Sequence, residues 1–352
     1  MAVVPIGGHH ERASVRKPRK TNGGKGVTEE IIEPDLPICD PHHHLWDFPN
    51  GRYLLDELLA DLVSGHKVES TVFVECGAMY SADASRLMSP VGETEFVNGV
   101  AAMSASGRYG PVRACAGIVG FADLTHADVG EALAAHIRAG GGRFRGIRHT
   151  GAWDPSDDVR NGHTNPPQGL YGREDFRRGF AQLAPNGLSF EAWQFHPQLP
   201  EVADLAAAFP ETTIVLDHVG GVLGIGPYAG RRDEEFARWK RDMALVAQHE
   251  NVVVKLGGLG MAICGFEFHK REALPSSAEL AEAWRPYIET CIELFGPRRA
   301  MFESNFPVDR VSCDYATLWN ALKRLAAGAS ADEKALLFRD VARSIYRLDE
   351  EY

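Results

Sequence analysis

Short apolar stretches alternate with longer amphipathic stretches from about residue 35 onward. The short stretches are rich in β-branched residues, which favour strands, and the long ones carry Ala and Leu at helical spacing. This alternation predicts repeated parallel β/α units. The predicted strands are Pro37–Cys39, Ser70–Val74, Arg113–Val119, Arg145–Arg148, Ser189–Phe195, Thr213–Leu216, Val252–Leu256 and Ala300–Phe302.

The loops between these elements indicate how the units are arranged. Loops that follow predicted strands are long, as in residues 77–92 and 150–173, whereas loops that precede strands are short. Long loops at the carboxyl ends of strands are typical of a (β/α)8 TIM barrel, whose active site lies at that end. The predicted helices are Leu54–Ser64, Glu93–Ser106, Ala127–Ala139, Glu174–Ala184, Pro200–Ala208, Asp233–Gln248, Ala278–Leu294, Asp314–Ala326 and Ala331–Tyr346.

An open, doubly wound α/β sheet is the alternative fold. Its support is a glycine-rich segment after the sixth predicted strand, with Gly220, Gly221, Gly224 and Gly226. These glycines do not have the G-x-G-x-x-G spacing of a dinucleotide-binding loop, and Pro227 follows them directly. The barrel is therefore the preferred prediction.

The first 34 residues differ from the rest of the chain. They contain clustered glycines and a basic stretch from Arg12 to Lys25, without apolar periodicity. Segments of this composition are disordered or lie as an extended arm. We expect an N-terminal arm over residues 1–34 and one barrel domain over residues 35–352.

Composition limits the classes of partner. The chain of 352 residues carries 37 Lys and Arg against 48 Asp and Glu, a net charge of −11, which is unsuited to nucleic acid or anionic membranes. No apolar run approaches the roughly 18 residues of a transmembrane helix. Six scattered cysteines without a C-x-x-C pair indicate free thiols, and no signal-peptide pattern is present. We expect a cytoplasmic protein that acts on a small molecule, and a homo-oligomer is compatible with the sequence.

Three histidines follow the first predicted strand, in the sequence Asp40-Pro41-His42-His43-His44. Side chains alternate between the two faces of a strand, so His42 and His44 are expected to point together into the barrel mouth. Two imidazoles so placed can bind one divalent cation, with nitrogens about 2.0–2.1 Å from zinc. A histidine-rich surface turn is the alternative, which the adjoining buried strand disfavours.

Other predicted strands also deliver polar residues at their carboxyl ends. His196 follows the fifth strand, His218 the sixth and Asn305 the eighth. Catalytic residues of a barrel come from the ends of several different strands. Four histidines at such positions therefore indicate an active site.

Two charged residues have two interpretations each. Glu75 ends the second strand and is a candidate catalytic acid or base, with an ion pair to Arg148 or Arg113 as the alternative. Lys255 in the seventh strand is a candidate for a substrate contact, with a structural ion pair as the alternative. Glu303 shares a strand face with Asn305, one layer deeper.

The ordered set of motifs resembles the amidohydrolase superfamily. It comprises the H-x-H of His42 and His44, the D-H-x-G of residues 217–220 and the S-N-F-P of residues 304–307. The resemblance covers residues 36 to 346. It is nearest to the amidohydrolase-2 branch, which contains sugar lactonases, 2-pyrone-4,6-dicarboxylate lactonase and related non-oxidative decarboxylases.

This resemblance implies roles for individual residues. His196 would complete a metal site with the strand-one pair, and His218 would assist the reacting water or carbonyl. Arg148 would bind a carboxylate or oxygen of the substrate. The family usually has Asp where this chain has Asn305, and an amide cannot accept a proton at neutral pH. Metal dependence is therefore left open, with zinc or manganese as the candidates.

Further residues are expected around the substrate. Arg148, His149 and Lys255 indicate an oxygen-rich or anionic molecule. Aromatic residues of the long loops are candidates for the pocket wall, with packing beneath their own loops as the alternative. They are Tyr80, Trp153, Tyr171 and Phe266.

Together these features predict hydrolysis of a lactone, with imidazoles, alone or with a metal, activating water or polarising the carbonyl. His218 would be the acid–base partner, and Asn305 would orient the water. The alternative is a metal-dependent non-oxidative decarboxylase of an aromatic or unsaturated carboxylate. A barrel that binds a ligand without turnover is a third hypothesis, and Asn305 is the feature that favours it.

Overall fold

The computed structural model describes residues 29–49 and 51–348, so most of the predicted N-terminal arm lies outside the described residues. Its main sheet has eight parallel strands, hydrogen-bonded to one another in sequence order. The first and last strands also meet, because the amide of His44 donates to the carbonyl of Phe306 over 2.8 Å. The strands are β1 (Pro37–His43), β4 (Lys67–Val74), β5 (Arg113–Gly120), β6 (Phe144–Arg148), β7 (Ser189–Ala192), β8 (Ile214–Leu216), β9 (Val252–Leu256) and β10 (Ala300–Phe302).

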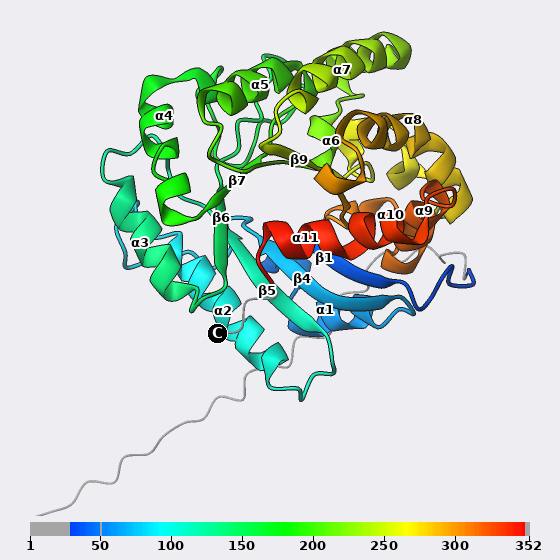
Figure 1. Cartoon of the computed structure of the whole chain (residues 1–352), viewed down its shortest axis with the longest axis horizontal. Coiled ribbons are helices and arrows are strands. Elements are labelled where there is room, and N and C mark those ends of the chain that lie inside the picture. Colours follow the sequence, from blue (N-terminus) through cyan, green and yellow to red (C-terminus); the bar gives the residue numbers. More distant parts are fainter. Residues whose placement is uncertain (1–28, 50, 349–352) are drawn as a thin grey trace, which may run out of the picture.

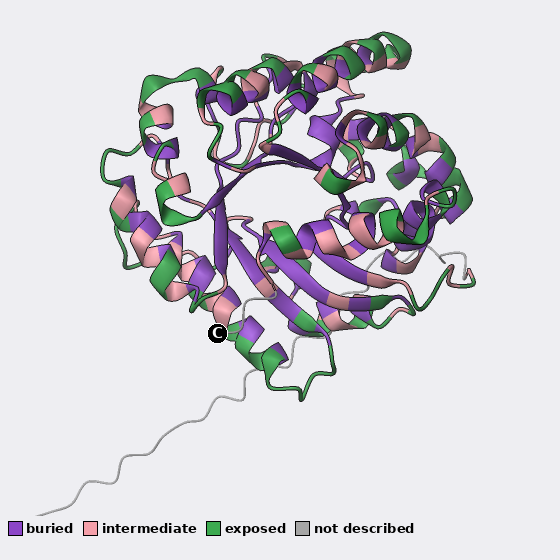
Figure 2. Ribbon diagram, viewed as in Figure 1, coloured by how far each residue is buried: buried purple, intermediate pink, exposed green. Residues whose placement is uncertain are grey.

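This nearly closed ring confirms the predicted TIM barrel and excludes the open sheet. Helices surround the strands, and their outer faces are exposed while the strands are buried (Figures 1 and 2). A short hairpin of β2 (Trp46–Phe48) and β3 (Gly51–Tyr53) follows β1. The helices are α1 (Leu55–Leu62), α2 (Val91–Ala105), α3 (Val129–Ala139), α4 (Glu174–Phe180), α5 (Leu199–Ala208), α6 (His218–Gly221), α7 (Arg232–Ala247), α8 (Ser277–Phe295), α9 (Tyr315–Leu325), α10 (Ala331–Ala335) and α11 (Val341–Ile345).

Local sequence explains where several helices begin. Ser276 accepts a hydrogen bond from the amide of Glu279 at the start of α8, and Asp314 accepts one from Thr317 at the start of α9. Such side chains satisfy backbone amides that have no partner within the helix. The helix predicted over residues 331–346 is instead interrupted by a π-helical segment, Leu336–Asp340, between α10 and α11.

The barrel interior contains an apolar layer, which we define as Val72, Val119, Val215, Val253 and Met301. These inward-facing side chains pack against α11 and the residues that follow it. Alternate strand residues face outward and pack against the surrounding helices. In Figure 1, α11 lies across the ring of strands, and the apolar layer packs against it.

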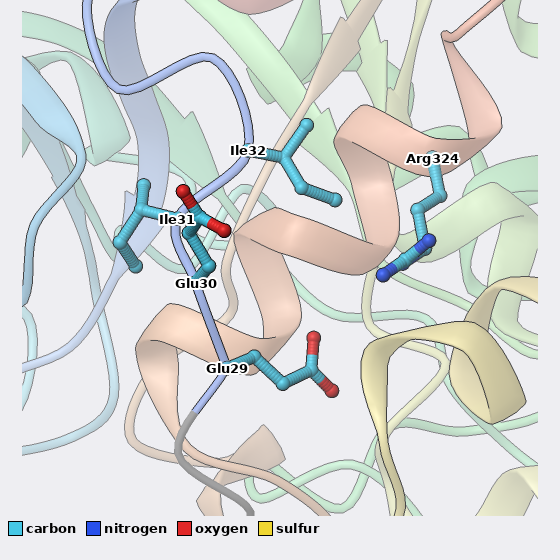
Figure 3. Close-up of a pocket in the computed structure, with 5 residues that line it drawn as sticks. All are labelled: Glu29, Glu30, Ile31, Ile32 and Arg324. Carbon is cyan, nitrogen blue, oxygen red and sulfur yellow. The ribbon is translucent and has the colours of Figure 1, made fainter.

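Two further features complete the fold. Residues 29–33 lie against α9, where the amide of Ile32 donates to Asn320 over 2.9 Å. A hollow lined by Glu29, Glu30, Ile31, Ile32 and Arg324 lies there and contains none of the predicted site residues (Figure 3). Over the part of the chain that the structure describes, every helix is too short or too polar to traverse a lipid bilayer.

Candidate active site

A layer of charged side chains lies next to the apolar layer. Asp217, Lys255 and Glu303 each come two residues after a member of the apolar layer, so strand alternation directs them into the same interior. Glu191, Glu75 and Arg148 complete the set, in which carboxylates outnumber permanent cations by two. All six are buried, and the most exposed, Arg148, keeps 5% of its surface. We call these six residues the charged layer.

Glu75 and Arg148 form an ion pair rather than separate catalytic groups. Arg148 Nε lies 2.7 Å from Glu75 Oε1, and Arg148 Nη2 donates to the Glu75 carbonyl. His163, from the loop after β6, lies 3.0 Å from the other carboxylate oxygen. Burial raises the pKa of Glu75, but His163 and Arg148 lower it more, to about 2. The ion-pair alternative therefore describes Glu75, and its proposed acid–base role is corrected because an ionised, paired carboxylate does not exchange protons near neutral pH.

This pairing also restricts Arg148. Its Nε and Nη2 are held by Glu75, so a bidentate clamp on the substrate is not available. The remaining nitrogen, Nη1, makes only long contacts, 3.4 Å to His42 Nε2 and 3.5 Å to Asp217 Oδ2. Arg148 therefore retains one weakly engaged donor.

Glu93 is a second buried carboxyl group next to Glu75, and its pKa is shifted in the opposite direction. Glu93 Oε1 accepts hydrogen bonds from the amides of Cys76 and Ala78, at 3.1 and 2.8 Å. Burial, together with the negative charge of Glu75, raises the pKa of Glu93 to about 8. Two adjacent carboxyls thus differ because only Glu75 has cationic partners.

Lys255 is enclosed by acceptors. Its Nζ lies 2.7 Å from Glu191 Oε2, 3.2 Å from Asp217 Oδ1 and 3.1 Å from His42 Nδ1. Burial lowers the pKa of Lys255, but the surrounding carboxylates raise it above its ordinary value, so the ammonium stays charged. Burial likewise raises the pKa of Asp217, and Lys255 and His42 bring it well below its usual range. Of the two interpretations of Lys255, the structure shows the ion pair.

His218 and Glu303 form a hydrogen-bonded pair at the mouth of the barrel. His218 Nδ1 lies 2.7 Å from Glu303 Oε1, which also accepts the His218 amide over 3.2 Å. Burial raises the pKa of Glu303, but His218 and His42 lower it to about 2. Because an ionised carboxylate only accepts hydrogen bonds, Nδ1 carries a hydrogen, and in the neutral tautomer of the ring this leaves the lone pair on Nε2.

The backbone and neighbours fix the position of His218. Its φ of 54° is in the left-handed region, which non-glycine residues rarely adopt, and such conformations concentrate at functional sites. A Cβ on Gly258 would lie 2.5 Å from the imidazole, so only glycine allows this approach. The ring of Trp193 lies 4.9 Å from that of His218, edge to face. Trp193 was not among the predicted wall residues, although it follows Glu191 on the same strand face.

Asn305 stands where the resembled family usually has Asp, and its amide cannot serve as the proton acceptor. Its amide nitrogen Nδ2 donates to Asp309 Oδ1 over 2.8 Å, and its backbone amide donates to the His42 carbonyl over 3.0 Å. Asp309 Oδ2 accepts the Gly260 amide over 2.8 Å. The side-chain oxygen of Asn305 has no hydrogen-bond partner among the described residues. It remains able to accept a hydrogen bond from a bound water.

The predicted histidine trio is not brought together. His44 Nδ1 lies 2.8 Å from the Val74 carbonyl, which leaves Nε2 with the lone pair, and its ring lies 5.0 Å from that of His42. His196 lies elsewhere, with Nε2 3.1 Å from Glu235 and Nδ1 accepting the Leu223 amide over 3.2 Å. Both His196 nitrogens are therefore engaged outside this cluster, which corrects its assignment as a third ligand.

Several predicted substrate contacts also point away from the site. The His149 ring packs on Phe121 and Phe176, and its Nδ1 accepts the Leu124 amide. Tyr171 is fully buried against Phe176, so it belongs to the core and not to a pocket wall. Strand alternation explains His149, which follows the inward-facing Arg148, whereas Tyr171 lies in a 3-10 turn, Leu170–Gly172, that packs into the core.

The other aromatic residues predicted for the pocket wall lie in different parts of the structure. Tyr80 is partly buried, and the charges of Glu75 and Glu93, together with burial, raise its pKa. It therefore lies near Glu75 and Glu93, and its place in the wall of a substrate pocket stays a prediction. Phe266 instead stacks on Phe268 beneath its own loop. Trp153 is partly buried, and its amide donates to Gln198 over 3.1 Å.

The charges around His42 decide whether it can bind a metal ion. Each ring nitrogen of His42 has a side-chain cation beside it, Lys255 at 3.1 Å from Nδ1 and Arg148 at 3.4 Å from Nε2, although Nδ1 also lies 3.0 Å from Glu303 Oε2. A divalent ion on either nitrogen would stand against like charge. As arranged, the residues do not fit a metal ion bound through His42. Among the described residues, two groups bring donor atoms of metal-binding type within 4.8 Å of one another, namely His42 with His218 and Glu303, and His42 with Glu191 and Asp217.

Comparison with known proteins places this geometry among relatives. The sequence profile of the amidohydrolase family matches residues 39–348. An uncharacterized protein of Sinorhizobium fredii is 33% identical over 336 residues, covering 89% of this chain and 99% of that protein. An L-fucono-1,5-lactonase of Burkholderia multivorans is 30% identical over 240 residues, covering 67% of this chain and 72% of that enzyme.

One solved structure extends the comparison to three dimensions. An amidohydrolase of Burkholderia multivorans with bound zinc has a TM-score of 0.67 and 25% sequence identity to this chain. The match covers 88% of this chain and 99% of that protein. The barrel is therefore shared along nearly its whole length with that protein.

Proposed function

The chain belongs to the amidohydrolase family, and from this membership we propose that it is a lactonase, which opens a cyclic ester at the carboxyl-terminal mouth of its barrel. The observation that carries the proposal is the pair formed by His218 and Glu303. A neutral imidazole held by an ionised carboxylate is the usual arrangement of a general base. The proposed substrate is an oxygen-rich or carboxylated small molecule.

The chemistry follows from the free nitrogen of His218. Nε2 accepts a proton from a water molecule as the water oxygen attacks the lactone carbonyl, and Glu303 stabilises the imidazolium that forms. When the ring C–O bond breaks, the imidazolium returns the proton to the leaving alkoxide. The products are a hydroxyl group and a carboxylic acid, so all atoms of water and lactone are retained.

Two further residues have roles in this proposal. The weakly engaged Nη1 of Arg148 stabilises negative charge that develops on the carbonyl oxygen. The free Oδ1 of Asn305 accepts a hydrogen bond from water and so helps to orient it. Neither role requires a metal ion, and no step here is assigned to one. Trp193, partly exposed beside His218, supplies an apolar wall.

Sugar 1,5-lactones are the first substrates to test, because a relative is named as an L-fucono-1,5-lactonase. Acid release would be followed with a pH indicator, with and without a chelator, for the wild type and for His218→Asn. We expect wild-type turnover that survives chelation and is lost in the variant. Carbon dioxide release from aromatic carboxylates would instead favour a decarboxylase. Ligand-induced thermal stabilisation without either product would indicate a binding protein and overturn the proposal.

A further inference from the structure

We propose that the ammonium of Lys255 takes the place of a metal ion within a cage formed by His42, Glu191 and Asp217, and that removing it opens a divalent-metal site. This Lys255 cage is one of the two groups whose donor atoms lie within 4.8 Å of one another. The inference concerns cation binding alone and does not depend on the proposed lactonase activity.

The contacts show how the cage is filled. Lys255 Nζ lies within 3.2 Å of all three members, at 2.7 Å from Glu191, 3.1 Å from His42 and 3.2 Å from Asp217. The ammonium hydrogen-bonds Glu191 and His42, and its contact with Asp217 Oδ1 is an ion pair without hydrogen-bond geometry. An imidazole nitrogen and carboxylate oxygens are ligand types that bind zinc in proteins, and three protein ligands leave a fourth position open. The lysine thus meets the requirement for a cation that such a cage creates.

The three donors are positioned by groups other than Lys255. The Tyr346 hydroxyl donates to Glu191 Oε1 over 2.5 Å, and Arg148 Nη1 lies 3.5 Å from Asp217 Oδ2. His42 is held by the backbone of β1. Shortening Lys255 therefore leaves the donors in place and removes the cation from two buried carboxyl groups, of which burial raises the pKa of Glu191 while Asp217 is ionised. Such carboxylates are strongly unfavourable unless a cation compensates them.

Two substitutions of Lys255 distinguish the loss of its charge from the opening of space for an ion. Lys255→Ala removes the ammonium and leaves room for an ion, whereas Lys255→Met removes the ammonium but fills the space with an apolar chain of similar length. After incubation with Co²⁺ and dialysis, we expect about one ion per chain in Lys255→Ala and far less than one in Lys255→Met and in the wild type. Elemental analysis gives the ratio, and visible absorption of Co²⁺ reports its coordination.

Thermal unfolding provides a second readout, independent of catalysis. We expect Co²⁺ to raise the Tm of Lys255→Ala, and a chelator to leave the Tm of the wild type unchanged. The double variant Lys255→Ala/Asp217→Asn removes one ligand together with the charge and should bind no Co²⁺.

Three outcomes would overturn the proposal. The first is folded Lys255→Ala that binds no Co²⁺. The second is wild-type protein that retains a stoichiometric ion, lost in His42→Ala. The third is Lys255→Ala that fails to fold even with Co²⁺ in the growth medium, while the double variant folds. Absence of lactonase activity in any of these proteins would bear on the proposed function and not on the cage.

Discussion

The apolar layer and the charged layer lie on neighbouring positions of the same strands. Val215, Val253 and Met301 belong to the first, and the residues two positions later belong to the second. Both layers are buried, yet one contains only hydrocarbon and sulfur whereas the other contains four carboxylates and two cations. Strand alternation therefore predicts which side chains face the barrel interior. It does not predict whether a layer of them stabilises the fold or takes part in the chemistry.

The two layers differ in how their burial affects stability. Burial of the apolar layer is favourable in proportion to the area removed from water. Burial of the charged layer is unfavourable unless each charge keeps its partner. The charged layer remains because its pairs orient His42 and His218, which face the mouth of the barrel. Substitutions in the two layers should consequently separate loss of activity from loss of folding.

The largest expected effect is on catalysis. Glu303→Gln places an amide against His218 Nδ1 and no longer stabilises the imidazolium, so kcat for lactone hydrolysis should fall about 10²–10⁴-fold. Steady-state kinetics on the best lactone and circular dichroism would be measured together. Because Glu303 acts through His218, KM should change little, and Glu303→Asp should recover part of kcat. A Glu303→Gln protein with wild-type kcat would remove this pair from the mechanism.

The next effect is on stability within the charged layer. Arg148→Met leaves Glu75 buried without its permanently charged partner and should lower the free energy of unfolding by about 3–5 kcal/mol. Urea denaturation of purified protein provides the measurement. The double variant Arg148→Met/Glu75→Gln removes both charges and should be more stable than the single variant. Equal stability of the two variants would show that the pair does not require charge balance.

A comparable loss without a change in chemistry is expected in the apolar layer. Met301→Ala removes a fully buried side chain and should lower the free energy of unfolding by about 2–5 kcal/mol through lost burial and a new cavity. At a temperature where the variant is folded, kcat should match that of the wild type. A large fall in kcat would show that the two layers are mechanically coupled and would contradict the separation argued here.

The most gradual effect, and the smallest per pH unit, is a pH dependence of stability at the edge of the charged layer. The pKa of Glu93 is raised from 4.5 to about 8, so between these values the folded protein keeps a proton that the unfolded chain has lost. Stability should therefore fall as pH rises through this window, by at most about 1.4 kcal/mol per pH unit, and level off above pH 8. Glu93→Gln has no such proton. Urea denaturation from pH 5 to 9 should show a wild-type slope relative to the variant, and parallel curves would refute the assignment.

The barrel could be predicted from the sequence because the same alternation of strand and helix patterns recurs along the chain. All eight predicted strands are present, and only their ends differ. The strand predicted over Ser189–Phe195 stops at Ala192, because the backbone then turns to bring Gln198 and α5 into place. The π-helical segment between α10 and α11 has no signal in apolar periodicity, since the pattern continues through it.

The site was predicted less completely, for a physical reason. Alternation correctly directed Glu303 into the interior, but a sequence does not show which of several inward charges pair with one another. Glu75 had two open interpretations until the Arg148 contact decided between them. His196 is placed by contacts to α7 that are distant in sequence and that no local motif indicates. Partner choice in a buried network is a property of the whole barrel.

The contact between Tyr346 and Glu191 has a consequence for how the protein is made. A ribosome synthesises all eight strands before it reaches Tyr346, so any barrel that forms at that stage lacks the hydroxyl that donates to Glu191. During that interval the carboxylate can pair only with Lys255 or with water. The final arrangement of the active site is therefore a late event in biosynthesis, and a nascent chain interrupted before α11 would carry every candidate catalytic side chain in an unfinished setting.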